Sequence, residues 1–177
     1  MDKDTAVAAI YTTHGRTELA MKALRRSGFC MEVLSVAGRP QSLDLRRVTP
    51  SALDVPIAKE RKQVVYWGGL WGHFLDSAFF WFPDLGPVMV AGPVVPRIVE
   101  ALDGAIERFG LSALATGFCS MGFSRSSILQ YESALKADKF VVVAQGYPLI
   151  AARARELING TQPEMLEVHT FGNRGGA

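Results

Sequence analysis

Two polar side chains lie inside the most apolar stretch of the chain, and their spacing makes them the first candidates for chemistry. His73 and Asp76 are three residues apart, so on a helix they would share one face. The pair can share a hydrogen bond or supply two metal ligands, whereas a protein zinc site normally takes at least three ligands from the chain. We therefore predict an Asp–His pair buried at a helix contact, and a metal site only if an oligomer axis repeats the pair. His169, in the last strand, is predicted to be a surface residue.

The cysteines are the next candidates, because a thiolate is both a nucleophile and a metal ligand. Cys119 lies in a small-residue segment, 117–122, that holds no Lys, Arg or His to favour the thiolate. Cys30 is far away in sequence and also has apolar neighbours, so both are predicted to be buried thiols. The Gly-x-Ser-x-Gly turn of serine hydrolases is absent. No catalytic constellation is complete, and we predict a non-enzymatic protein with no catalytic residues and no cofactor.

The composition is that of one globular domain. The chain has 177 residues, of which 49% are hydrophobic and 20% charged, so it can bury a core and is not a disordered segment. The formal net charge of +2 argues against a dedicated nucleic-acid binder, which carries a clustered basic excess. The first residues, Met1-Asp-Lys-Asp4, lack the basic and apolar regions of a signal peptide. We expect a cytoplasmic protein without a nucleic-acid partner, and membrane association is an open alternative.

Residues 1–39 and 124–171 have the pattern of one split α/β domain. Each half alternates short apolar or β-branched runs with segments of helical spacing. The expected strands are 5–11, 32–37, 140–144 and 165–171, and the expected helices run from Thr12 or Thr13 to Gly28, over 124–137, and from Pro148 to Gly160. Two strand–helix–strand units in one sheet predict an α+β fold, a ferredoxin-like βαβ…βαβ sandwich.

A long segment separates these two halves. Residues 40–63 are polar and contain three prolines, which predicts a linker. Residues 64–123 are rich in glycine, aromatic and small residues, and we expect a glycine-rich apolar helical insertion there, with helices at 96–109 and 111–121. Residues 172–177 are predicted to be a mobile tail.

The insertion is also the predicted surface for self-association or membrane docking. A small sandwich cannot cover so many aromatic side chains with its own surface, and a large bare apolar patch marks an interaction site. Glycines four residues apart let two helix backbones approach closely. The residues predicted to make this contact are Trp67, Gly68, Gly69, Trp71, Gly72, Phe79, Phe80 and Trp81. A membrane span is disfavoured, because Asp76 in mid-helix would cost roughly 2.5–3.5 kcal/mol.

Six segments are distinctive in combination: residues 28–38 (GFCMEVLSVAG), 67–72 (WGGLWG), 77–80 (SAFF), 86–93 (GPVMVAGP), 110–114 (GLSAL) and 131–140 (YESALKADKF). Together they resemble a small bacterial family of general stress proteins and predicted membrane proteins that have no established activity. The likeness covers about residues 5–160 and departs from the family pattern at His73 and Asp76. It implies an α/β domain split by a glycine-rich apolar segment.

These observations favour a non-enzymatic bacterial stress-type protein that forms a homo-oligomer through its insertion. A membrane surface or another protein is the alternative partner for the same residues. A small-molecule or metal-binding regulatory domain is the second hypothesis, and it rests on analogy with other ferredoxin-like sheets.

If the glycines of the insertion set the distance between subunits, Gly72→Leu will disperse the oligomer, because the added side chain holds the two backbones apart. The measurement is the molar mass of the purified variant by light scattering. An oligomer of unchanged mass would remove the role assigned to these glycines.

Overall fold

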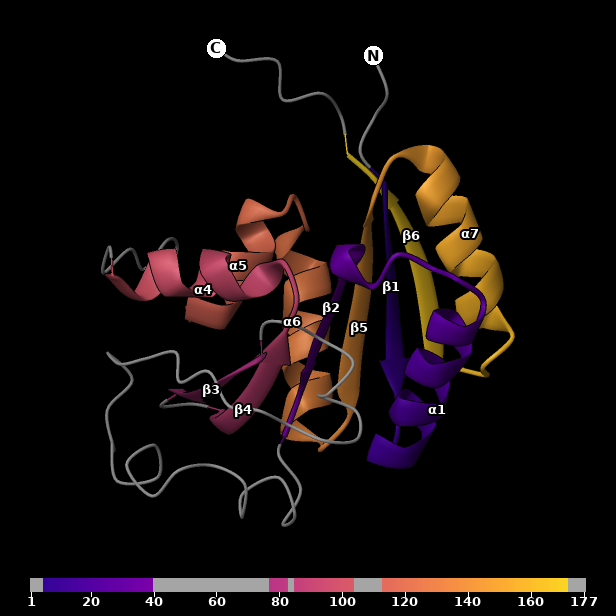
Figure 1. Ribbon diagram of the computed structural model, residues 1–177. Helices are drawn as coiled ribbons and strands as arrows, with labels where there is room; N and C mark the ends of the chain where they lie inside the picture. The colour runs from indigo at the N-terminus through magenta and orange to yellow at the C-terminus, as the bar shows by residue number, and fades with distance from the viewer. Residues whose placement is uncertain (1–4, 40–76, 83–84, 104–112, 172–177) are drawn as a thin grey trace.

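The computed structural model describes residues 5–39, 77–82, 85–103 and 113–171, and these form one antiparallel sheet with helices on both faces (Figure 1). The six strands lie in the order β3-β4-β2-β5-β1-β6. The strands are β1 (Thr5–Tyr11), β2 (Leu34–Gly38), β3 (Ser77–Phe82), β4 (Gly86–Ala91), β5 (Phe140–Gly146) and β6 (Met165–Thr170). The helices are α1 (His14–Arg26), α4 (Val94–Asp103), α5 (Ala113–Ser120), α6 (Arg125–Lys136) and α7 (Pro148–Asn159), with a short 3-10 turn at Met31–Val33.

Two strand–helix–strand units interleave at the centre of this sheet. The unit β1–α1–β2 has strand β5 between its two strands, and β5 is antiparallel to both of them. The unit β5–α7–β6 has β1 between its strands in the same way. The predicted α+β class is therefore confirmed, and the strands of the two halves are found at the predicted places.

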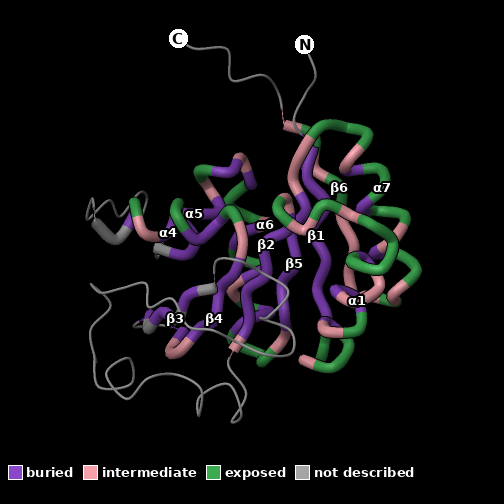
Figure 2. Tube along the Cα trace, viewed as in Figure 1, coloured by how far each residue is buried: buried purple, intermediate pink, exposed green. Residues whose placement is uncertain are grey.

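Both faces of the sheet are covered, and each central strand is buried on both sides (Figure 2). Ala6, Ala8 and Ile10 of β1 pack with α4, α5 and α6, on what we call the α6 face. Val7 and Tyr11 pack with α1 and α7, on what we call the α7 face. Alternate residues of a strand point to opposite faces, so a strand in this position is apolar at most of its positions.

The helix ends follow the predicted signals. The Thr13 hydroxyl caps α1 by accepting the backbone N–H of Arg16 at 3.2 Å. Gly28, just after this helix, has φ of +73°, the left-handed conformation that glycine adopts without strain. Ser124 caps α6 in the same manner, and Pro148 opens α7.

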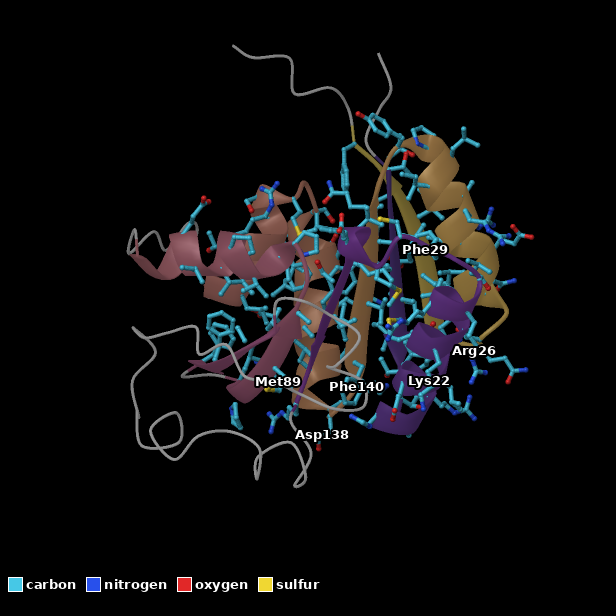
Figure 3. All side chains as sticks on the ribbon, viewed as in Figure 1. Lys22, Arg26, Phe29, Met89, Asp138 and Phe140 are labelled. Carbon is cyan, nitrogen blue, oxygen red and sulfur yellow. The ribbon has the colours of Figure 1, made fainter. Side chains whose placement is uncertain are left out.

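The insertion is not entirely helical, and this part of the prediction is wrong. Residues 77–82 form β3 and residues 86–91 form β4, a hairpin that pairs with β2 and widens the sheet. Phe80 and Val88 are buried on the α6 face, while Met89 is buried on the α7 face. Figure 3 shows Met89 at the same end of the sheet as Phe140, which belongs to the same buried cluster. Burial on both faces explains why the run that forms β4 is continuously apolar.

The two small-residue helices of the insertion are confirmed as α4 and α5, and they pack against each other within the chain. A Cβ at Gly117 would approach the side chain of Ile98 to 2.8 Å, so glycine is needed for this close packing. The start of α4 is tied to the sheet, because the backbone N–H of Val94 donates to the buried hydroxyl of Ser35 at 3.1 Å. Gly117 therefore serves packing inside one chain. The predicted linker 40–63 and tail 172–177 lie outside the described residues.

Gly92 joins β4 to α4 with φ of +95°, and a Cβ there would collide with the backbone of Leu34 and Ser35. We predict that Gly92→Ala lowers the free energy of unfolding by about 3 kcal/mol, because strain and backbone overlap add up. Urea denaturation measures the effect. The matched control is Gly15→Ala, where an added Cβ meets nothing within 4 Å and a helix gains about 1 kcal/mol or less. Equal stabilities of the two variants would contradict this account.

Candidate functional site

Most residues predicted for association or metal binding lie outside the described residues. These are Trp67, Gly68, Gly69, Trp71, Gly72, His73 and Asp76. For Phe79 and Trp81 the structure describes the backbone alone, opposite Met89 and Pro87 of β4. The predictions for these positions stay predictions.

Phe80 requires a correction, since it is the one residue of the predicted docking set whose side chain is described. Only 2% of it is exposed, and its ring stacks on Phe82 with a centroid separation of 5.7 Å. Both rings lie in the cluster on the α6 face, together with Val95 and Leu114. Because the chain itself covers Phe80, this residue is not available to a partner.

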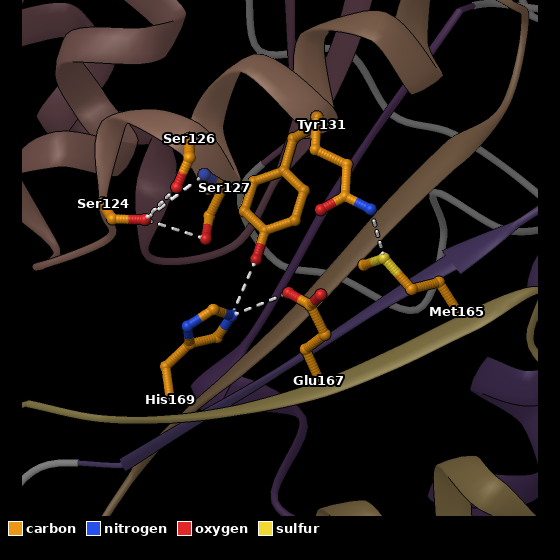
Figure 4. Close-up of polar contacts among 8 residues, drawn as sticks. Ser124, Ser126, Ser127, Tyr131, Met165, Glu167 and His169 are labelled. Atoms are coloured by element: carbon orange, nitrogen blue, oxygen red, sulfur yellow. Dashed lines mark hydrogen bonds and ion pairs between the residues drawn. The ribbon is translucent and has the colours of Figure 1, made fainter.

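The described residues bring together another polar group, at the edge of the sheet where α6 lies against β6 (Figure 4). The phenol oxygen of Tyr131 is 3.0 Å from Nε2 of His169. A carboxylate oxygen of Glu167 is 3.4 Å from the same nitrogen. A phenol, an imidazole and a carboxylate thus converge on one atom, and we call these three residues the edge cluster.

Strand alternation and one helix face position the edge cluster. Met165, Glu167 and His169 of β6 pair with residues of β1 that face α6, so they share this face. Tyr131 lies on the buried side of α6. Next to the cluster, the side-chain amide of Gln130 donates to the Met165 sulfur at 2.8 Å, which adds a second contact between helix and strand.

Aromatic rings surround the imidazole. The Phe123 ring meets His169 edge-on at 5.1 Å and Tyr131 at 5.6 Å. Phe171 stacks on the imidazole with an angle of 8° between the planes. Only 19% of the His169 side chain is exposed, so the prediction of a surface histidine is wrong. The imidazole is instead largely buried among aromatic rings.

The protonation of Tyr131 follows from its surroundings. Burial raises the pKa of the phenol, the negative charge of Glu167 raises it further, and a hydrogen bond with the Ser127 side chain lowers it. The net effect is upward, so the phenol is neutral at physiological pH. Its O–H can then donate to Nε2 of a neutral imidazole, which leaves the ring proton of His169 on Nδ1.

The hydroxyls at the start of α6 extend this polar group toward solvent. The Ser124 hydroxyl donates to the Ser127 hydroxyl at 3.0 Å and lies 3.1 Å from that of Ser126. Phenol, imidazole, carboxylate and hydroxyl groups are suited to binding a polar partner and exchanging protons with it.

The sequence also raised metal binding, buried thiols and membrane insertion, and each can be compared with the described residues. No group of three or more His, Cys, Asp or Glu side chains that could hold a metal ion occurs in them. Cys30 and Cys119 are free thiols; Cys30 is exposed, so the prediction that it is buried is wrong, and Cys119 is partly buried. Within the same residues, no helix has the length and apolar character needed to cross a membrane.

The comparisons with known proteins add no assignment: no family model, curated protein or solved structure matches this chain. The edge cluster was not found from the sequence, because Tyr131 and His169 are distant in the chain and meet only when α6 packs on β6. The sequence offers one signal for it, the alternation of Met165, Glu167 and His169 along the strand. This alternation indicates that the three side chains share one face of the sheet, but it does not indicate which helix covers that face.

The raised pKa of Tyr131 predicts alkaline sensitivity. Above about pH 10 the phenol ionises in the unfolded chain while the folded chain keeps it protonated, so the free energy of unfolding falls as pH rises. Tyr11, whose pKa burial raises to about 12, adds to the same fall. We expect Tyr131→Phe to reduce the slope of stability against pH above pH 10.

Urea denaturation at about pH 8 and about pH 11 measures this slope. Tyr147→Phe is the matched control, because it removes a phenol that is 62% exposed. Identical slopes for the wild type and Tyr131→Phe would show that ionisation of Tyr131 does not control alkaline stability.

Proposed function

We propose that this chain is a non-enzymatic protein whose function is to associate with copies of itself. The edge strand β6 carries this proposal. The resemblance to bacterial stress-type proteins is compatible with it.

We interpret the strands β6-β1-β5-β2, with α1 and α7, as a ferredoxin-like unit. The support is the interleaving of two strand–helix–strand units in one antiparallel sheet. The hairpin β3–β4 then extends this unit at β2, and β6 remains at the opposite edge.

Strand β6 has the properties of an edge that accepts another strand. In the described part of the chain it pairs with β1 on one side and with nothing on the other. Proteins usually protect such an edge with Lys, Pro or a bulge, because its free N–H and C=O groups recruit another strand. The sequence of β6, Met-Leu-Glu-Val-His-Thr, contains neither Lys nor Pro. Val168, in its middle, is 47% exposed.

The test is the molar mass of the purified protein by light scattering, over a concentration series and with and without a mild detergent. We expect a defined oligomer without detergent. A monomer at every concentration would overturn the proposal. Protein recovered only with detergent would replace self-association with a membrane role for the insertion.

A second candidate, a regulatory domain that binds a small polar molecule, is favoured by the edge cluster. Glu167 is 40% exposed and the adjacent imidazole of His169 is 19% exposed, so both residues are accessible to a small polar ligand. Native mass spectrometry of the purified protein tests this function. A retained small molecule that is lost in His169→Ala would support it, and protein of the mass of the bare chain would count against it.

A further inference from the structure

We propose that two copies of this chain pair through their β6 strands, antiparallel and about a two-fold axis at Val168, so that their sheets become one. This inference rests on the proposed self-association and specifies its surface and register. It concerns described residues alone.

The two faces of the sheet restrict the register. Glu167 and His169 belong to the α6 face, while Leu166, Val168 and Thr170 belong to the α7 face. A two-fold axis perpendicular to the sheet places each face of one copy beside the same face of the other. Directly opposed residues must therefore share a face. This condition is met when one residue lies directly opposite its own copy at the axis. It fails when the axis lies between two successive residues, because their side chains point to opposite faces.

Polar pairing then favours one of the registers that remain. An axis at Glu167 opposes this carboxylate to its own copy, and like charges directly opposite each other destabilise a strand pair. An axis at His169 opposes two imidazoles and gives Glu167 no imidazole opposite it, whereas a hydrogen-bond donor opposite an acceptor stabilises a strand pair. An axis at Val168 opposes Glu167 to His169 of the second copy, and symmetry makes this pair twice. The same axis places the exposed Val168 against its own copy.

The edge cluster leaves these groups able to make the new contacts. When the Tyr131 phenol donates to Nε2 of His169, the proton of the neutral imidazole lies on Nδ1. Among the described residues Nδ1 has no hydrogen-bond partner, so this N–H can donate across the axis. Glu167 is 40% exposed at the same edge and can accept it.

A second copy fits this edge better than an unrelated strand, because β6 is complementary to itself. On one side of Val168 the strand has Leu166 and Glu167, and on the other side it has His169 and Thr170. The axis at Val168 therefore sets Glu167 opposite His169, and Leu166 opposite Thr170. Self-complementary surfaces of this kind form isologous two-fold interfaces, the commonest symmetry of protein oligomers.

Disulfide trapping tests the register. In a background of Cys30→Ser and Cys119→Ala, the variant Val168→Cys places two thiols directly opposite each other. Opposed residues of antiparallel strands have Cα atoms about 4.5–5.5 Å apart, within the roughly 4.4–6.8 Å that a disulfide spans. We expect a covalent dimer under mild oxidation by oxidised glutathione.

The matched control is Thr170→Cys in the same background. Thr170 lies on the same face of β6 and is exposed, but in this register the two copies of residue 170 are about 13 Å apart along the strands. It should form at least tenfold less covalent dimer. Equal cross-linking of both variants would indicate random collision and overturn the register.

Val168→Lys provides a measurement that does not depend on oxidation. A Lys at this exposed position opposes its own copy across the axis, and we expect the dissociation constant of the dimer to rise at least tenfold, while Val168→Thr leaves it within about threefold. Two results together would overturn the β6 interface: the wild-type oligomer persists in Val168→Lys, and Val168→Cys forms no covalent dimer. Self-association itself would then still stand. A monomeric wild type would overturn both.

Discussion

The pairing of β1 with β5 is the constraint on which the rest of the structure depends. The two strands run antiparallel from Thr5 opposite Gly146 to Tyr11 opposite Phe140, at the centre of the sheet. Helices cover both faces, so the backbone groups of these strands have little access to water and must satisfy each other. Small residues such as Ala6, Ala8 and Ala9 let the helices approach from both sides. The strands β2 and β6 extend this pair on its two sides, β2 beside β5 and β6 beside β1.

The sequence predicts this central part well because its signals are local. Helices α1, α6 and α7 have apolar spacing on one side and a capping residue at the start, and β5 is rich in β-branched residues. The strands and helices of residues 5–39 and 124–171 were found where the pattern placed them. Periodicity alone could not assign β3 and β4, since a strand buried on both faces and a buried helix both read as an apolar run. The correct choice depends on the free edge of β2, which no local pattern reveals.

The candidate site was less predictable than the fold. Tyr131 lies on the buried side of its helix, as the apolar spacing of α6 requires. Its contact with His169 depends on how α6 lies against β6, where the rings of Phe118 and Phe123 pack on the ring of Tyr131. The sequence predicts a site in the insertion because that segment is rich in glycine and aromatic residues. Glu167 and His169 lie in a short strand whose composition is ordinary. Position at a sheet edge, and not composition, makes these two residues candidates.

The order of strands has a consequence for synthesis of the chain. Both neighbours of β1 come late, because β5 begins at Phe140 and β6 at Met165. A ribosome adds about 5–20 residues per second, so β1 and its apolar side chains wait on the order of ten seconds for their partners. During that interval the nascent chain exposes an unpaired apolar strand, which is the kind of segment that chaperones bind. Efficient production of this protein should therefore depend on protection of its N-terminal strand until translation is nearly complete.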